Sequence, residues 1–252
     1  MSALTGRVAV VTGSSRGIGA GIAQLFAREG AKVALHGRDV EALAAVKTAI
    51  ERSGGTAIAV PAETTSWNQV DQMRRTVEAD LGPIDILVAN AGGNLTPPGP
   101  VEDMSDEAWR ATVDINLTAT FLTIKSVLPG MKQRRAGNII TLSSAAARRP
   151  SERSPAAYTA AKAGIELLTQ IVAIQAGPYN IRVNCIAPET ILTERNREHI
   201  PAAQQGALIE QHPLKRLGTP QDIAHAALFL ASDAAGWISG TVLDVAGGSV
   251  LV

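Results

Sequence analysis

The sequence is short of three things: cysteine, net charge and long apolar runs. Its one cysteine, Cys185, cannot form a disulfide within the chain and excludes a metal cluster built on cysteines, so we expect a buried, inert thiol. Lys and Arg number 23, and Asp and Glu also number 23, so the chain lacks the overall field of a protein that binds nucleic acid or anionic membranes non-specifically. No run of about 18 apolar residues could span a bilayer, and residues 1–7 are too short and too little apolar for a signal peptide. These absences favour a soluble, cytoplasmic protein with no nucleic-acid or membrane partner.

Apolar residues are nevertheless plentiful enough for a large core. The chain has 252 residues, of which 46% are hydrophobic, and a mean hydropathy of +0.11. Short β-branched runs alternate with stretches of 3.6-residue apolar spacing, such as 18–28, 40–50, 68–81 and 109–131. The expected strands cover residues 7–12, 32–35, 56–60, 84–89, 138–142, 181–186 and 241–245.

This alternation predicts an α/β fold, a doubly wound, seven-stranded parallel sheet with helices on both faces. No proline-rich linker or internal repeat divides the chain, so we expect a single domain over residues 1–252. Residues 189–212 are polar and poorly patterned. They could form either a mobile substrate lid or a plain surface excursion.

A glycine-rich turn follows the first expected strand. Its sequence over residues 12–19 is Thr-Gly-Ser-Ser-Arg-Gly-Ile-Gly, and it leads directly into a helical pattern. Glycines let the backbone approach a pyrophosphate closely, and the start of a helix offers free N–H groups and a positive dipole end. Any tight strand-to-helix turn can use glycine, but the position after the first strand makes dinucleotide binding the favoured interpretation.

Tyr158 and Lys162 lie four residues apart in a helical stretch, so their side chains share one face. A free tyrosine titrates near about 10, and an adjacent ammonium would lower the pKa of the phenol towards the working pH of an acid–base catalyst. The same spacing occurs by chance in amphipathic surface helices. The motifs elsewhere in the chain decide between these interpretations.

Those motifs occupy the ends of the expected strands and one helix. They are Gly13 and Gly17 spaced by four, Asn90-Ala91-Gly92 after the fourth strand, Asn116 in Asp-Ile-Asn, and Ser143-Ser144 after the fifth strand. Together with Tyr158 and Lys162 they resemble the short-chain dehydrogenase/reductase family over nearly the whole chain. Residues 213–220, 229–232 and 240–248 are similar to its 3-oxoacyl-(acyl-carrier-protein) reductase branch. The resemblance implies a Rossmann-type oxidoreductase that uses a nicotinamide cofactor.

The resemblance also implies roles for particular residues. Tyr158 would be the general acid in ketone reduction and the base in alcohol oxidation, and Ser144 would hydrogen-bond the reacting oxygen, with Ser143 as the adjacent alternative. Lys162 would hold the nicotinamide ribose and lower the pKa of Tyr158. Asn116 would kink its helix and anchor a water that relays protons to Lys162.

For the cofactor, NADP(H) is favoured over NAD(H). By the same resemblance, the position of the acidic residue that binds the ribose 2'-OH in NAD-specific folds falls on Gly37, and Arg38 and Arg16 would suit a 2'-phosphate. Arg38 could instead be a solvated surface residue, and Asp39 is better interpreted as a helix N-cap. The implied cofactor-binding residues are Gly13, Ser15, Arg16, Gly17, Ile18, Gly19, Arg38, Glu63, Thr64, Asn90, Ala91, Gly92, Tyr158, Lys162, Pro188, Ile191 and Thr193.

Four positions depart from the pattern of the 3-oxoacyl reductase branch. Glu189 replaces a usual glycine and puts a carboxylate beside the expected nicotinamide contacts, including Ile191 and Thr193. The other departures are Glu63-Thr64 at the adenine position, Ala89 before Asn90, and Ala246 before Gly247. None of them removes a catalytic group.

Two groups of cations suggest partners. One group lies in the loop before Tyr158 and could either attract an acidic substrate or form a solvated loop with Glu152; it consists of Arg148, Arg149 and Arg153. The other group could either dock an acidic acyl-carrier protein or simply complement a helix dipole; it consists of Lys132, Arg134 and Arg135. His199, His212 and His225 have no metal-ligand spacing, and we expect no metal.

The sequence thus predicts an NADPH-dependent carbonyl reductase that acts on a ketone such as a 3-oxoacyl thioester and is reversible as an alcohol dehydrogenase. The alternatives are an NAD-dependent secondary-alcohol or sugar dehydrogenase and a catalytically silent NADP-binding sensor or scaffold. The resemblance implies a homotetramer, with the helix of Tyr158 and the C-terminal strand region at its interfaces.

Overall fold

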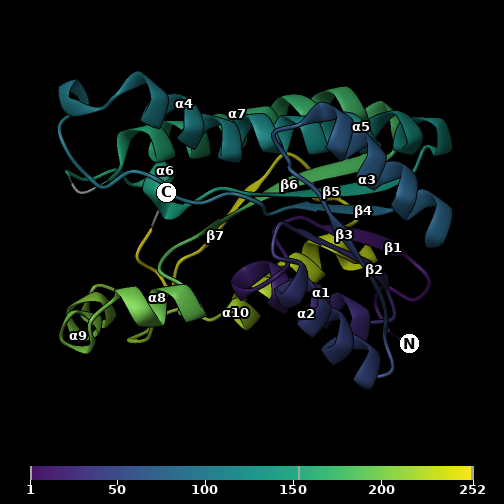
Figure 1. Cartoon of the computed structure of the whole chain (residues 1–252), viewed down its shortest axis with the longest axis horizontal. Coiled ribbons are helices and arrows are strands. Elements are labelled where there is room, and N and C mark those ends of the chain that lie inside the picture. The colour runs from purple at the N-terminus through teal and green to yellow at the C-terminus, as the bar shows by residue number, and fades with distance from the viewer. Residues whose placement is uncertain (1, 153, 251–252) are drawn as a thin grey trace.

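The computed structural model describes residues 2–152 and 154–250 and contains one parallel sheet. The seven strands run in the order β3-β2-β1-β4-β5-β6-β7 (Figure 1). They are β1 (Val8–Val11), β2 (Lys32–Gly37), β3 (Thr56–Pro61), β4 (Ile86–Ala89), β5 (Gly137–Leu142), β6 (Ile181–Pro188) and β7 (Val242–Val245). The predicted doubly wound fold is confirmed. Because one sheet joins both ends of the chain, we propose that the chain forms one domain.

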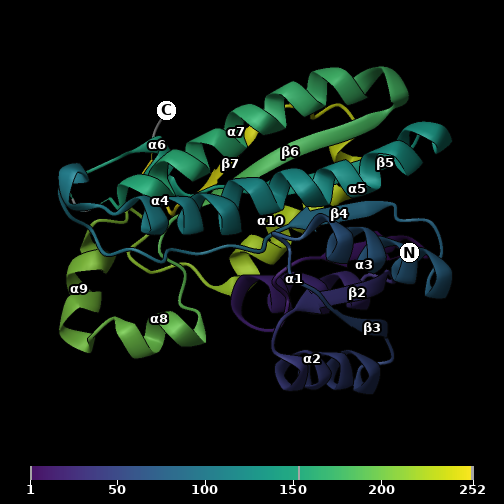
Figure 2. The same ribbon diagram turned by 45° about the horizontal axis from the view of Figure 1, so that its top comes forward.

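Helices cover both faces of this sheet (Figure 2). On one face lie α1 (Gly17–Arg28), α2 (Val40–Arg52) and α10 (Pro220–Ala231). On the other lie α3 (Trp67–Asp80), α5 (Ala119–Arg134) and α7 (Ala156–Ala176). Neighbouring residues of β1 point to opposite layers, Ala9 and Val11 to the first and Val8 and Val10 to the second. This double burial explains why the strand is apolar at every position.

The order of the strands places a crevice at the centre of the sheet. From β1 the chain builds outward to β2 and β3, then returns to β4 on the other side of β1. Loops that leave β1 and β4 at their carboxyl ends therefore diverge, and ligands of open α/β sheets bind at such a switch point. The glycine turn after β1 and Asn90 after β4 lie there.

The helix expected over residues 109–131 is interrupted. It consists of α4 (Asp106–Val113), a π-helical turn (Asp114–Thr118) and α5. The Asn116 amide Nδ2 donates to Thr112 O at 2.8 Å, so a side chain enters the backbone hydrogen-bond ladder, a recognised cause of irregularity in helices. The helix is thus irregular at Asn116, and the predicted kink in its axis stays a prediction.

Residues 189–212 are more regular than their sequence suggests. They contain α8 (Glu194–His199) and α9 (Ala202–Glu210), which project from the body of the molecule in Figure 2. The Thr193 hydroxyl accepts from Asn196 N at 3.2 Å and begins α8 as an N-cap. Whether this helical pair acts as a lid stays a prediction.

Cys185 lies in the middle of β6 and is fully buried. Burial raises the pKa of its thiol to about 11, as expected for an apolar surrounding. The prediction of a buried thiol is confirmed. Over residues 2–152 and 154–250, none of the helices combines the length and apolarity needed to cross a membrane.

Candidate active site

The loops after β1 and β4 are tied together by hydrogen bonds. The Thr12 hydroxyl accepts from Asn90 N at 3.0 Å and from Ala91 N at 2.9 Å. In return the Asn90 amide donates to Thr12 O at 2.9 Å and to Gly13 O at 3.1 Å. The glycine turn is therefore held in place from across the switch point.

This turn has no room for side chains at its closest points. A Cβ on Gly13, whose φ is +64°, would lie 2.9 Å from Ala91 Cα, and a Cβ on Gly19 would lie 2.3 Å from Gly13 O. The N-cap of α1, Arg16, makes no side-chain capping bond, and the first turn holds no acidic residue. The free N–H groups and the positive end of α1 thus form a cradle suited to a phosphate.

His36 at the end of β2 supports the same turn, a role that the sequence did not reveal. Its Nδ1 accepts from Gly13 N at 3.3 Å and its Nε2 lies 3.0 Å from Ala62 O. Since a backbone N–H can only donate and a carbonyl can only accept, the ring is neutral with its proton on Nε2. Burial lowers the pKa of His36, in agreement with this neutral form.

The two cations expected to face a 2'-phosphate lie at the rim of the crevice beside carboxylates. Arg16 pairs with Asp39, and Arg38 Nη1 lies 3.6 Å from Glu63 Oε2. The Arg38 side chain is 79% exposed, so its guanidinium can reorient at little cost. Asp39 also accepts from Ala42 N at 3.0 Å, which confirms it as the N-cap of α2.

Ser144, Tyr158 and Lys162 come together between β5 and α7. Ser144 is the N-cap of α6 (Ala145–Arg148), and its hydroxyl hydrogen-bonds Tyr158. Lys162 is buried and its Nζ donates to Leu142 O at 2.8 Å, 5.6 Å from the centre of the Tyr158 ring. Ser143 points away towards α7, where its hydroxyl donates to Glu166 Oε1 at 2.7 Å. This arrangement supports Ser144 over Ser143 as the group that faces a substrate.

The titration behaviour of this group differs from the simplest expectation. Burial raises the pKa of Tyr158, and the Ser144 hydrogen bond opposes that rise only in part. Burial also lowers the pKa of Lys162 to about 8, so its ammonium is itself easily lost. The lowering of the Tyr158 pKa by Lys162 is not seen in this structure, where burial is the largest influence on the phenol. It stays a prediction for the protein with its cofactor.

Asn116 is buried beneath the crevice and does not line it. Its side chain makes two hydrogen bonds to the backbone of Gly93. Gly93 N donates to Asn116 Oδ1 at 3.1 Å, and Asn116 Nδ2 donates to Gly93 O at 2.8 Å. Asn116 therefore holds the loop after β4. The proton relay through Asn116 stays a prediction.

Glu189, the departure after Pro188, lies at the end of β6. Its Oε2 accepts from Thr190 N and lies 2.7 Å from Nε2 of the buried His212. The Nδ1 of His212 lies 2.7 Å from Leu208 O. The pair joins the end of β6 to the end of α9, a contact that sequence spacing gave no means to find.

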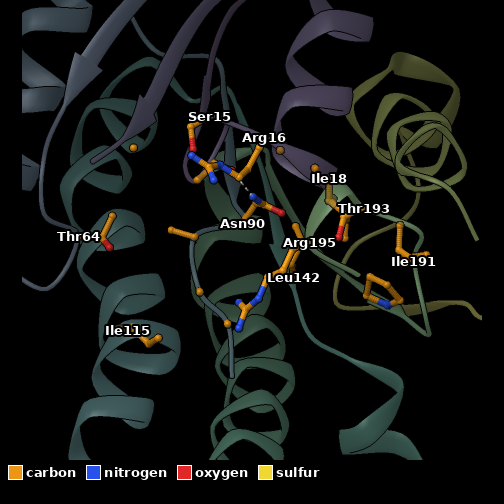
Figure 3. A pocket seen from close by; sticks show the side chains of 18 of the residues that line it. Ser15, Arg16, Ile18, Thr64, Asn90, Ile115, Leu142, Ile191, Thr193 and Arg195 are labelled. Atoms are coloured by element: carbon orange, nitrogen blue, oxygen red, sulfur yellow. Dashed lines mark hydrogen bonds between the residues drawn. The ribbon is translucent and has the colours of Figure 1, made fainter. Parts of the chain in front are cut away.

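One cavity of about 500 Å³ brings the predicted cofactor residues together. Figure 3 shows Ser15, Arg16 and Ile18 at the start of α1, Thr64 and Ile115 on one side, and Ile191 and Thr193 on the other. All 17 predicted cofactor-binding residues line it, as do Ser143 and Ser144. It is also lined by residues that were not predicted: His36, Gly37, Ala62, Gly93, Ile115, Leu142, Glu189, Glu194, Arg195 and Asn196. The fold and the cavity are those of a dinucleotide-binding α/β protein with a tyrosine–lysine pair on the cavity wall.

Comparison with known proteins gives the family. The model of a family described as Enoyl-(Acyl carrier protein) reductase matches residues 13–249. The 7alpha-hydroxysteroid dehydrogenase of Escherichia coli (strain K12) is 38% identical over 247 residues, 98% of this chain and 95% of the relative. The 3-oxoacyl-(acyl-carrier-protein) reductase of Synechocystis sp. is 38% identical over 253 residues, 100% of each chain.

A solved structure agrees with the sequence relatives. A 7 alpha-hydroxysteroid dehydrogenase complexed with NADH and 7-oxo glycochenodeoxycholic acid is 38% identical with a TM-score of 0.92, covering 98% of this chain and 95% of that chain. The chain therefore belongs to the short-chain dehydrogenase/reductase family of oxidoreductases, which bind a nicotinamide cofactor. The crowded glycine turn, the uncapped start of α1 and the 500 Å³ cavity fit such a dinucleotide.

Proposed function

We propose that the protein is an NADPH-dependent reductase that converts a ketone to a secondary alcohol and can run in reverse. The observation that carries the proposal is the placement of Ser144, Tyr158 and Lys162 on the wall of the cavity that fits the dinucleotide. The pyrophosphate would lie on the glycine turn and the start of α1. Pro188, Ile191 and Thr193 would contact the nicotinamide, and Lys162 its ribose.

The chemistry is divided between the cofactor and the protein. When bound, the nicotinamide supplies the hydride for reduction or accepts it in oxidation. Tyr158 donates the proton that the reduced carbonyl oxygen needs, and Ser144 hydrogen-bonds the same oxygen and stabilises its developing charge. Lys162, buried beneath Tyr158, favours the phenolate that remains once the proton has left.

Two observations support NADPH. Gly37 provides no carboxylate for a ribose 2'-OH, and Arg16 and Arg38 both line the cavity. A 2'-phosphate would draw these guanidinium groups away from Asp39 and Glu63. An exposed ion pair contributes little to stability, whereas a phosphate accepts stronger, charge-assisted hydrogen bonds.

The same two ion pairs favour a second candidate, an NAD-dependent alcohol or sugar dehydrogenase. Asp39 and Glu63 already satisfy the cations, and the solved relative holds NADH. Initial rates with NADPH and NADH over a panel of ketones and acyl thioesters test the proposal. A higher kcat/KM with NADPH supports it, a preference for NADH moves the assignment to the second candidate, and no turnover with either cofactor refutes both.

The cations suggested for acyl-carrier docking lie far from this chemistry. Lys132 and Arg134 belong to the last turn of α5, next to the amino end of β5, whereas the cavity opens at the carboxyl ends of the strands. Arg134 donates to Ile84 O at 2.6 Å and Arg135 to Pro178 O at 2.8 Å. An acyl-carrier protein, as a partner of this chain, would therefore have to dock elsewhere.

We also propose a cytoplasmic homotetramer. Helix α7, which carries Tyr158, exposes Leu167, Ile171 and Ile174, with exposed fractions of 65%, 52% and 73%. Such an apolar stripe at helical spacing is suited to pack against another copy. Light scattering over a range of concentrations should give the mass of four chains, and a monomer at every concentration would refute the assembly.

A further inference from the structure

A second cavity opens beside the catalytic serine. It has a volume of about 640 Å³ and shares Ser144, Glu189 and Asn196 with the cofactor cavity, and we refer to it as the outer cavity. The loop after β5, the segment after β6, the end of α9 and the C-terminal segment form its walls, all at the end of the molecule where Figure 1 shows α6, α8 and α9. A carbonyl placed against Ser144 would extend into this space.

The walls of the outer cavity are polar. The described lining residues include the hydroxyls of Ser151, Ser154 and Ser249 and the amides of Asn196 and Gln211. Their apolar members are the small side chains of Ala145, Ala146, Pro150 and Val250, and none of them is Leu, Ile, Met, Phe, Tyr or Trp. Pockets for fatty acyl chains and similar ligands are lined mainly by large apolar side chains. The outer cavity therefore suits a small substrate that carries several polar groups.

Arg149 provides a cation for such a substrate. Its neighbour Arg148 is held by Asp244 at 3.3 Å and Glu166 at 3.4 Å, and Arg153 lies outside the described residues. Arg149 has no carboxylate within ion-pair distance in the described part of the chain, and its Nη1 donates to Ser249 O at 2.8 Å. This bond leaves guanidinium N–H groups for a carboxylate, which arginine binds in bidentate fashion.

Glu189, which lines the same cavity, provides an acceptor. Its Oε2 is occupied by Thr190 N and His212 Nε2, whereas its Oε1 has no hydrogen-bond donor among residues 2–152 and 154–250. Because His212 is buried and anchored by Leu208 O, the carboxylate is fixed at the boundary between the two cavities. An ionised carboxylate can only accept, so its natural partner is a hydroxyl donor.

We propose that the substrate is a small hydroxylated carboxylic acid with its reacting oxygen on Ser144 and Tyr158. Arg149 binds its carboxylate and Glu189 Oε1 accepts from one of its hydroxyls. This inference rests on the proposed function, because it names the substrate class of the same site.

Matched substrates provide the test. Rates of reduction are compared for 5-ketogluconate and fructose, two hydroxylated six-carbon ketones of which only the first carries a carboxylate, with NADPH and with NADH. The wild-type protein should prefer the acid in kcat/KM, and Arg149→Gln should lower the acid-to-neutral ratio by about 10- to 100-fold. Arg149→Lys, which keeps the charge, should retain part of the wild-type preference for the acid. Arg52→Gln, a loss of the same charge at the exposed end of α2, should leave the ratio unchanged.

A binding measurement separates this inference from the proposed function. Isothermal titration of gluconate into the protein should show binding that Arg149→Gln and Glu189→Ala weaken, whether or not turnover is detected. Turnover of neutral ketones with a ratio that Arg149→Gln does not change would overturn the substrate class and leave the reductase in place. The proposed substrate class would also be overturned if gluconate did not bind and 5-ketogluconate did not react.

Discussion

Asn116 and Gly93 form a two-point contact between the joint of α4 and α5 and the wall of the cofactor cavity. Gly93 N donates to Asn116 Oδ1 at 3.1 Å, and Asn116 Nδ2 donates to Gly93 O at 2.8 Å and to Thr112 O at 2.8 Å. One fully buried side chain thereby maintains both the π-helical turn and the loop after β4.

Asn116→Ala should destabilise the protein because it leaves Gly93 and Thr112 without these partners. A buried group left unpaired costs about 1–3 kcal/mol, and Thr112 is buried while Gly93 is half-buried, so we expect a loss of about 2 kcal/mol in the free energy of unfolding, measured with urea. Asn68→Ala, at an exposed position of α3, is the control and should change little. Equal stability of the two variants would contradict the structural role of Asn116.

Tyr158→Phe should remove the proton donor and leave the shape of the site intact. General acid–base catalysis is worth about 10²- to 10⁴-fold, so kcat should fall by at least about 100-fold. Cofactor affinity, measured by quenching of protein fluorescence, should stay close to that of the wild type. The matched control is Tyr179→Phe, the other tyrosine of the chain, which is 37% exposed and lies outside the cavity. A loss of less than tenfold in Tyr158→Phe would reject the assignment.

Arg38→Gln should change the choice of cofactor. Loss of a guanidinium that binds a 2'-phosphate should lower kcat/KM for NADPH by about tenfold or more and leave NADH almost unaffected, since NADH has no such group. Arg75→Gln, which removes an exposed arginine of α3, serves as the control. If Arg38→Gln lowered kcat/KM for NADPH and for NADH equally, Arg38 would have no part in recognising the phosphate.

The stability of the protein should depend on Lys162 at alkaline pH. Burial lowers the pKa of Lys162 to about 8, whereas a lysine in the unfolded chain titrates near about 10.4. Between these values the unfolded chain binds one more proton than the native protein, so stability rises with pH in this window. Relative to Lys162→Met, the wild-type protein should gain up to about 3 kcal/mol between pH 8 and 10.4.

Comparison with Lys162→Met is needed because Cys185 acts in the opposite direction. Burial raises the pKa of its thiol to about 11, so the unfolded chain loses this proton first and stability falls as the pH rises above about 8.5. The difference between the two proteins reports Lys162 together with its electrostatic interaction with Cys185. Urea unfolding at pH 7, 8, 9 and 10 measures it, and a difference independent of pH would show that Lys162 is not perturbed.

The Cys185 thiol should resist modification in the native protein. It is fully buried and its pKa of about 11 leaves almost no thiolate at pH 8, while an ordinary cysteine at about 8.5 would be partly ionised. Ellman's reagent at pH 8 should therefore react with one thiol per chain in urea and with almost none without it. Rapid reaction of the native protein would show that β6 opens to solvent.

Much of the fold and of the site follows from local patterns. The β1–α1 glycine turn, the spacing of Tyr158 and Lys162, and the alternation of apolar runs with helical periodicity all depend on residues close together in the chain, where chain geometry itself sets the relation. The N-cap role of Asp39 is of the same kind. The irregularity at Asn116 was expected only from the family resemblance, because nothing in its neighbours disfavours a continuous helix.

Tertiary structure decided which charged and polar side chains satisfy one another. Arg148 and Arg149 are neighbours in sequence, but Arg148 forms an ion pair with Asp244, whereas Arg149 lines the outer cavity. It also turned Glu189, recognised from the sequence only as a departure, into one half of a pair with His212. Such contacts join positions 23 to 96 residues apart, and short-range periodicity carries no information about which distant partners will meet. The sequence by itself determined the order of the elements and the presence of the proposed catalytic groups, whereas packing decided what surrounds them.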